Sequence, residues 1–382
     1  MEFGLTEEHL MIQDAAKEFA RQELLEGVTE RDDNGIYPRE QIKKMGELGF
    51  MGMMVDPQYG GGGMDSLSYS LAVEEISKVD AAAAVVMSVN NSLVCWGIEK
   101  YGTEEQKQKF LVPMAEGKVI GGFCLSEPEA GSDATMQRTT AIKDGDFYVM
   151  NGTKNWITSA ANAQYFIVIA ATDPSKGHKG ISAFIVDRDT DGFELGPKEN
   201  KMGMRASDTH SIMFNDMKVP VENRIGDEGF GFKLAMSILS GGRIGIASQA
   251  LGIAQGALDL AVQYSKERKA FGKFLHEHQS VAFKLADMET EIQVSRLMVH
   301  KACWLKDEHD YANLNHFSAM AKLKAAETAM YVTTEAVQIH GGYGYVKEYH
   351  VERLMREAKL TQIYEGTSEV QKIVISRTLT RD

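Results

Sequence analysis

One carboxylate stands in a glycine-containing turn near the C-terminus, in the run from Ile363 to Glu369. Ser368 and Gln371 have the spacing of a capping box, which predicts a helix over Glu369 to Arg377 directly after the turn. The start of a helix has unpaired N–H groups and favours an anion. We therefore predict that Glu365 is a general base. The alternative, a solvated loop acid, is the commoner use of a surface glutamate.

Residue types that bind metals or form cross-links show no such grouping. Three cysteines, Cys95, Cys124 and Cys303, are far apart and odd in number, which argues against a disulfide framework and a zinc cluster. The one close histidine pair, His276 and His278, lacks the spacing of a helical metalloprotease motif and fits a polar loop. We expect reduced, partly buried thiols and no metal site.

Composition and charge restrict the class of protein. The chain has 382 residues, of which 43% are hydrophobic and 25% charged, as in soluble globular proteins. No run approaches the ~20 apolar residues of a membrane span. The net charge of −13 argues against nucleic acid, which needs a basic surface. The acidic start, from Met1 to Glu8, resembles neither a signal peptide nor a transit peptide, so no export or organelle signal is expected.

The hydrophobic pattern changes twice along the chain. It is helical from Thr6 to about Gly117, with a capping box at Thr103 and Gln106. Short β-type runs then extend to Asn223, and helical spacing returns after Gly229. The predicted turns in the β region are Asp144-Gly145, Asn151-Gly152 and Lys179-Gly180; the predicted late helices are Phe232–Leu239, Leu251–Arg268, Val281–Lys306 and Ala319–Gln338. We expect three domains: helical 1–118, β 119–229 and helical 230–382.

Five motifs in this order carry a family resemblance. They are the segment Phe123–Asp133, Trp156–Thr158, Arg268–Gly272 with Gln279, Gln338–Gly344, and Tyr364–Thr367. Together they resemble the acyl-CoA dehydrogenase flavoprotein family over essentially the whole chain, and the variants LSEP, SGGR and IYEGTSE resemble its short-chain, butyryl-CoA type. The resemblance implies an α+β fold with an N-terminal helical domain, a middle β-barrel or sandwich domain and a C-terminal four-helix bundle.

The resemblance also implies that FAD lies extended between the β-domain and the C-terminal helices. Ser126 and Thr158 would hydrogen-bond the flavin ring, and Trp156 would pack along its edge, the alternative being a core aromatic. Arg268 suits a diphosphate because its forked donors match two oxygens. Part of this set would act across a subunit interface. The complete implied set is Phe123, Leu125, Ser126, Ser132, Trp156, Thr158, Arg268, Phe271, Gln279, Gln338, Gly341, Gly342, Thr367 and Glu369.

For the substrate, the resemblance implies that Ser132, Ser240 and Arg243 line the coenzyme A channel and that Tyr364 and Gly366 flank the thioester. Arg243 could equally be a surface residue or form an interdomain salt bridge. Some relatives carry their catalytic glutamate one position before this arginine. Gly242 stands there in this chain, so Glu365 is the only base that the motif pattern allows.

The implied reaction is the α,β-dehydrogenation of a short-chain acyl-CoA, butyryl-CoA to crotonyl-CoA or the reverse. Glu365 would remove the α-proton and flavin N5 would take the β-hydride. Branched side chains in the run Val85, Val86, Met87 and Val89 would shorten the acyl pocket, although a core helix explains them equally well.

Several alternatives stay open: a dehydrogenase for branched or dicarboxylic substrates, an oxidase, and a non-catalytic flavin-bound scaffold. The family implies electron-transferring flavoprotein as partner and a homotetramer built as a dimer of dimers. We expect a bacterial cytoplasm, or the mitochondrial matrix if the chain has been processed.

Overall fold

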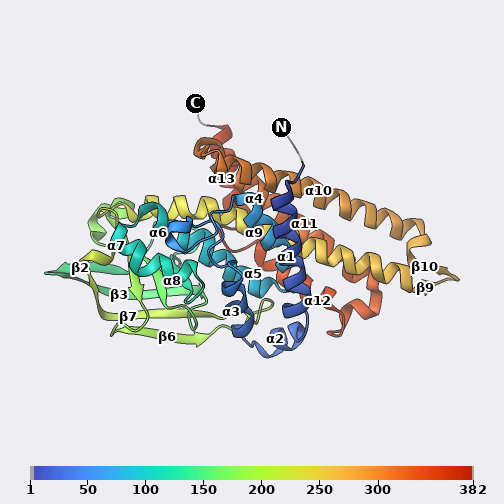
Figure 1. Cartoon of the computed structure of the whole chain (residues 1–382), viewed down its shortest axis with the longest axis horizontal. Coiled ribbons are helices and arrows are strands. Elements are labelled where there is room, and N and C mark those ends of the chain that lie inside the picture. The colour runs from blue at the N-terminus through green and yellow to red at the C-terminus, as the bar shows by residue number, and fades with distance from the viewer. Residues whose placement is uncertain (1–3, 381–382) are drawn as a thin grey trace.

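The computed structural model describes residues 4–380. Helices form the first part of the chain, a β-sheet the middle and long helices the last part (Figure 1). The hydrophobic pattern predicted this order, and the α+β fold class is confirmed.

Four of the early helices begin where a side chain accepts a free backbone N–H. Thr6 caps α1 (Glu7–Phe19), and Thr103 forms the predicted capping box with Gln106 in α7 (Glu104–Gln106). The others are α2 (Val28–Asn34), α3 (Arg39–Glu47), α4 (Ser66–Ser77), α5 (Ala81–Ser88), α6 (Trp96–Tyr101) and α8 (Val112–Ala115), with π-helical turns at Ala20–Leu24, Val89–Cys95 and Lys107–Leu111 and a 3-10 turn at Pro57–Tyr59.

One helical stretch, Ala81–Tyr101, is long and apolar enough to cross a membrane, which the sequence analysis missed. Its most apolar window is 94% buried inside the protein. Burial on all sides explains the apolar composition, so this stretch is a core helix.

Eight strands form one mixed sheet in the order β6-β7-β3-β2-β4-β5-β8, with β1 parallel to β4. Gly145 has a φ of 60° in the β2–β3 hairpin, as predicted for a turn. Asn151-Gly152 is not a turn: it lies inside β3, at a β-bulge, where Gly152 has a φ of 145°. The strands are β1 (Gly121–Cys124), β2 (Thr140–Asp144), β3 (Phe147–Thr158), β4 (Tyr165–Ala171), β5 (Ile181–Asp187), β6 (Phe193–Lys198), β7 (Thr209–Pro220) and β8 (Arg224–Ile225).

The late helices are longer than their sequence pattern suggested. Phe232–Leu239 and Leu251–Arg268, predicted as separate helices, belong to one helix of 37 residues, α9 (Gly231–Glu267). Its interior glycines allow close packing: a Cβ on Gly252 would lie 2.3 Å from the Glu74 carbonyl oxygen of α4. The other elements are β9 (Lys269–Ala270), β10 (Lys273–Phe274), α10 (Gln279–Asp307), α11 (Tyr311–His340), α12 (His350–Thr361) and α13 (Ser368–Leu379).

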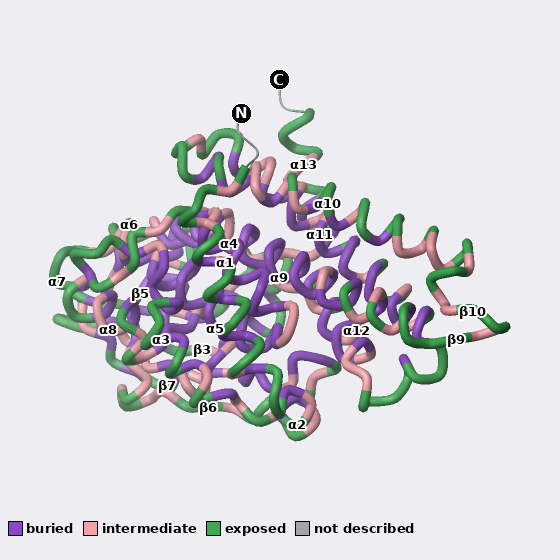
Figure 2. Tube along the Cα trace, turned by 45° about the vertical axis from the view of Figure 1, so that its right-hand side comes forward, coloured by how far each residue is buried: buried purple, intermediate pink, exposed green. Residues whose placement is uncertain are grey.

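Burial differs along these helices. Near α4 and α5 the tube of α9 is buried, whereas the far end, which carries β9 and β10, is largely exposed (Figure 2). The three cysteines are free, and they are fully buried where partial burial was predicted. The described residues contain no cluster of three or more metal-ligating side chains.

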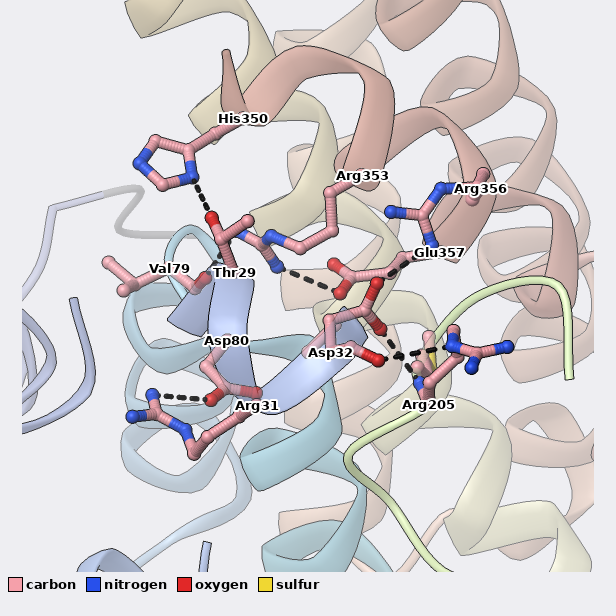
Figure 3. Close-up of polar contacts among 12 residues, drawn as sticks. Thr29, Arg31, Asp32, Val79, Asp80, Arg205, His350, Arg353, Arg356 and Glu357 are labelled. Carbon is pink, nitrogen blue, oxygen red and sulfur yellow. Dashed lines mark hydrogen bonds and ion pairs between the residues drawn. The ribbon is translucent and has the colours of Figure 1, made fainter. Parts of the chain in front are cut away.

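Helix α12 is fastened to the early helices by the ion pair of Arg356 with Asp32 and by hydrogen bonds (Figure 3), and Arg356 also donates to the Met202 carbonyl in the loop after β6. Arg353 pairs with Glu357 at 2.8 Å and donates to the carbonyl of Val79. Arg356 donates to Asp32, which also accepts a bond from the backbone N–H of Arg205. Since α12 leads directly to the turn that holds Glu365, these bonds fix one end of that turn.

Candidate active site

Glu365 lies in the short turn between α12 and α13, in a backbone conformation that glutamate rarely adopts. Its φ is 54°, and Gly366 follows with a φ of 90°. The predicted capping box of Ser368 and Gln371 is wrong: Thr367 caps α13, accepting from the N–H of Val370, and the Gln371 side chain donates to carbonyls of the turn. Helix α13 consequently begins one residue earlier than predicted.

One oxygen of the Glu365 carboxylate is out of contact with water. The residue as a whole is half-buried, but its Oε2 is inaccessible and has no hydrogen-bond partner among the described residues. Burial raises the pKa of Glu365 to about 7, while the charges of Lys322 and Arg243 act to lower it. A carboxyl group with a pKa near neutrality is suited to general-base work, and a solvated loop acid would not show this shift.

Glycine at position 242 makes room for this carboxylate. A Cβ there would lie 3.0 Å from Oε2 of Glu365 and 2.6 Å from a methyl group of Leu93. Gly242 is therefore part of the wall that faces the base, on the helix α9 that also carries Arg243 and Ser240.

Arg243 is next to Gly242 on α9 and has no salt bridge within the described residues. Its Nη1 donates to Oδ1 of Asn315 at 2.7 Å and its Nε has no partner. Ser240 donates to the same oxygen at 3.3 Å. Desolvation lowers the pKa of Arg243 to about 10, while the charge of Glu365 acts to raise it.

An apolar cluster adjoins the site. Tyr364 packs against it and hydrogen-bonds the buried Gln249. Of the four residues predicted for the acyl pocket floor, only Val85 and Val89 belong to this cluster; Val86 and Met87 pack into a different core. The same cluster includes Leu93 and Leu125, and Phe123 packs against it.

The loop after β1 is held by a buried ion pair that the sequence analysis did not predict. Lys154 is fully buried and donates to Oε1 of Glu127 at 2.7 Å and to the Leu125 carbonyl at 3.1 Å. The neighbouring Ser126 is half-buried, and Ser132 is exposed on the same loop. The pair therefore sets the backbone on both sides of Ser126.

Trp156 is not a core aromatic. Its side chain is 61% exposed, with a φ of 62° at the bulge in β3, and Thr158 ends the same strand. This large exposed indole stands near the half-buried Ser126, because the N–H of Asn155 donates to the Ser126 carbonyl.

The remaining predicted cofactor residues lie together at the far end of α9. Arg268 and the two glycines Gly341 and Gly342 line an open hollow of about 700 Å³. A Cβ on either glycine would meet no atom within 4 Å. The whole exposed set is Arg268, Phe271, Gln279, Gln338, Gly341 and Gly342.

Within one chain, the residues around Glu365 and Arg243 lie far from the predicted cofactor residues around Arg268. Arg243 and Arg268 are separated by 25 residues along α9, which is about 37 Å at 1.5 Å per residue. Figure 1 likewise shows β9 and β10 at the opposite end of the molecule from the sheet. Thr367 and Glu369 lie with Glu365, at the base of α13.

The sequence analysis missed two buried polar side chains, Lys154 and Lys322, and assigned Gln371 only a helix-capping role. Lys322 donates to the Gly366 carbonyl at 2.7 Å from the middle of α11. A single lysine in an alanine-rich helical pattern gives no sign of burial, because the sequence does not show which face is covered.

Family models match nearly the whole chain. The models described as acyl-CoA dehydrogenase N-terminal, middle and C-terminal domains match residues 6–118, 122–217 and 229–380. A short-chain specific acyl-CoA dehydrogenase of Clostridium acetobutylicum is 51% identical, over 98% of this chain and 99% of the relative. The mitochondrial short-chain enzyme of Mus musculus is 48% identical, over 99% of this chain and 91% of the relative.

Solved structures agree with these matches. Butyryl-CoA dehydrogenase from Megasphaera elsdenii superimposes with a TM-score of 0.98 at 50% identity, with both chains fully covered. A chain in a structure described as the electron transferring flavoprotein of Acidaminococcus fermentans gives 0.98 at 52% identity, again with full coverage of both chains.

Proposed function

The chain belongs to the acyl-CoA dehydrogenase family, and from that premise we propose that it dehydrogenates short-chain acyl-CoA thioesters at the α,β-bond, with Glu365 as the base. The observation that carries the assignment of the base is the buried, unpaired Oε2 of Glu365 beside the apolar cluster of Val85 and Val89. Butyryl-CoA to crotonyl-CoA, or the reverse, is the proposed reaction.

Glu365 takes the α-proton, which is a very weak acid in a thioester, so the carbonyl oxygen needs a donor as negative charge develops on it. The backbone N–H of Glu365 has no acceptor among residues 4–380 and is free to serve. The carboxyl group is mostly in its ionised, basic form at pH values above its pKa of about 7.

The family is FAD-dependent, and FAD supplies the acceptor for the β-hydride when bound. The residues of this chain fit such a group in two parts. Ser126, Trp156 and Thr158 offer hydroxyls and an exposed ring beside the sheet, while Arg268 offers a forked cation at an open glycine-lined hollow.

Two copies of the chain are needed to join these parts. The separation of about 37 Å along α9 exceeds what one set of contacts on one chain can span, so we assign the Arg268 end to FAD held mainly by a second copy. A homotetramer built from such dimers satisfies this arrangement. Electron-transferring flavoprotein is the proposed electron acceptor.

The short acyl preference rests on Val85 and Val89, because branched side chains in the cluster beside Tyr364 restrict the length of the pocket. A bacterial cytoplasm or a mitochondrial matrix stays a prediction, since relatives of both kinds match.

An anaerobic titration of the purified protein with butyryl-CoA tests the proposal. Loss of the flavin absorbance at about one equivalent per subunit is expected, with slower reduction by octanoyl-CoA. A yellow protein that butyryl-CoA does not bleach would redirect the assignment to longer, branched or dicarboxylic thioesters. Rapid peroxide formation in air would indicate an oxidase, and a colourless protein a scaffold.

Replacement of the base provides the second test. Glu365→Gln keeps the carbon skeleton and the bound FAD but removes the base, so reduction by substrate is expected to slow by about 100-fold or more, the scale of general-base catalysis. Glu308→Gln, an exposed acid at the end of α10, is the matched control. Near-normal reduction by the Glu365 variant would reject the assignment.

A further inference from the structure

Two successive residues of the catalytic turn have left-handed backbone conformations. Glycine has no Cβ, so Gly366 tolerates its φ of 90°. Glu365 has a Cβ, and a φ of 54° is therefore an unfavourable conformation for it. Such a conformation persists only where the surroundings hold it in place. The groups that hold this turn therefore help to decide where the carboxylate points.

Two buried side chains bind the carbonyls of the turn. Lys322 of α11 donates from Nζ to the Gly366 oxygen at 2.7 Å. Gln371 of α13 donates to the same oxygen at 2.9 Å and to the Glu365 oxygen at 3.1 Å. Both side chains are fully buried. Three hydrogen bonds from two helices thus fix both carbonyl groups.

A buried lysine is an unusual donor to a backbone carbonyl, because burying a cation is costly unless it is paired. Lys322 has no ion pair within 4 Å among the residues that the structure describes, and its hydrogen bond goes to a neutral carbonyl. Desolvation lowers the pKa of Lys322 to about 8, and the charge of Glu365 acts to raise it again. The negative charges that act on this lysine are those of Glu365 and, to a smaller extent, Glu369.

We propose that Lys322 and Gln371 are positioning residues for Glu365: both hold the turn in its left-handed conformation, and the Lys322 ammonium in addition favours the ionised, proton-accepting carboxylate. The inference rests on the proposed function, since it explains how the proposed base is aimed and charged. It assigns two separable effects, orientation to both residues and charge to Lys322 alone.

Other charged and titratable groups face the same carboxylate. Arg243 approaches from α9 and favours its ionised form as Lys322 does. Tyr69 on α4 and Tyr364 in the turn are neutral phenols whose pKa values are raised by burial and by the charge of Glu365. Removal of Lys322 leaves Arg243 as the one cation that acts directly on Glu365 among the described residues, so the carboxylate remains titratable but less acidic.

The test compares three variants in the anaerobic reduction by butyryl-CoA, measured from pH 5.5 to 9. Lys322→Met removes the donor and the charge at nearly equal length, and Gln371→Met removes donors only. Lys324→Met, two residues along the same helix, is the matched control because that lysine pairs with Glu291 on the flank of α10 and α11. Flavin content and thermal unfolding are recorded for each.

In Lys322→Met and Gln371→Met, butyryl-CoA is expected to reduce the bound flavin at least tenfold more slowly than in the parent protein at its optimum pH. Both variants should retain FAD. Only Lys322→Met should also move the acidic limb of the pH profile upward, by about one pH unit, as expected for loss of a nearby opposite charge. Lys324→Met should match the parent in both. If Lys322→Met gives no folded protein, Lys322→Gln removes the same charge and retains a donor group.

An acidic limb that does not move in a folded, flavin-loaded Lys322 variant would overturn the charge effect. Full reduction rates in Gln371→Met would overturn the orientation effect. Failure of butyryl-CoA to reduce the parent protein would instead reject the proposed function, so the two kinds of failure are distinguishable.

Discussion

Gly242→Ala tests whether the wall of α9 sets the position of the base. The added methyl group would lie 3.0 Å from Oε2 of Glu365 and 2.6 Å from Cδ2 of Leu93, both closer than an ordinary van der Waals contact. Overpacking of this kind costs about 1–3 kcal/mol. The helix gains about 0.8–1 kcal/mol from alanine in place of glycine, so the net loss of stability is small. The Leu93 methyl group, which is the closer contact, and the Glu365 carboxylate must both shift to admit the added methyl group.

Displacement of a reacting group by about 1 Å can cost 10²-fold in rate, and the 3.0 Å contact with the carboxylate requires a shift of a few tenths of an ångström. We therefore expect Gly242→Ala to fold, to retain FAD and to be reduced by butyryl-CoA about 10-fold more slowly. Stopped-flow reduction and thermal unfolding measure the two effects separately.

The neighbouring Gly241→Ala is the matched control. It has the same helical gain, but its Cβ would meet nothing closer than 3.8 Å. It should therefore be at least as stable as the parent and reduced at a similar rate. Equal rates for both alanine variants would refute the idea that Gly242 makes room for the base.

Two further predictions follow from the same geometry. Because burial raises the pKa of Glu365 to about 7 and the ionised form is the base, kcat/KM for butyryl-CoA should fall as the pH drops below about 7, and a profile that stays flat to pH 5 would contradict the assignment. Arg268→Ala, which removes charge-assisted bonds at the exposed end of α9, should weaken FAD retention while Lys269→Ala next to it should not; a variant that purifies with full flavin content would reject the role of Arg268.

The order of helices and sheet could be predicted because hydrophobic period and capping residues are local signals. The capping box at Thr103 is an example. Asn151-Gly152 was misread for the same reason: the pair has turn chemistry, and only the pairing of β3 with β7 makes it a bulge. The gap left between the predicted helices Phe232–Leu239 and Leu251–Arg268 is helical. Glycine there lowers helix propensity, but close packing of α9 on its neighbours outweighs that cost.

The identity of the candidate base could be predicted from its motif, but its environment could not. The shift in the pKa of Glu365 comes from burial and from two cations, Lys322 and Arg243, that are 43 and 122 residues away in the sequence. Such long-range contacts leave no periodic signal. The opposite case is Phe271, 99% exposed on this chain: a large exposed aromatic is informative only once a second copy is considered.

The strained turn of Glu365 is held from both sides. Buried polar and charged side chains that do not contact the reacting atoms hold it in place. On one side, Arg353 and Arg356 tie α12 to Val79 and Asp32 (Figure 3). On the other, Gln371 and Lys322 bind the carbonyls of the turn. Breaking a buried pair is costly because it leaves an uncompensated charge, so α12 cannot easily shift relative to the early helices. A left-handed glutamate needs such a frame, since its own backbone preference would return it to a conformation in which the carboxylate no longer faces Gly242.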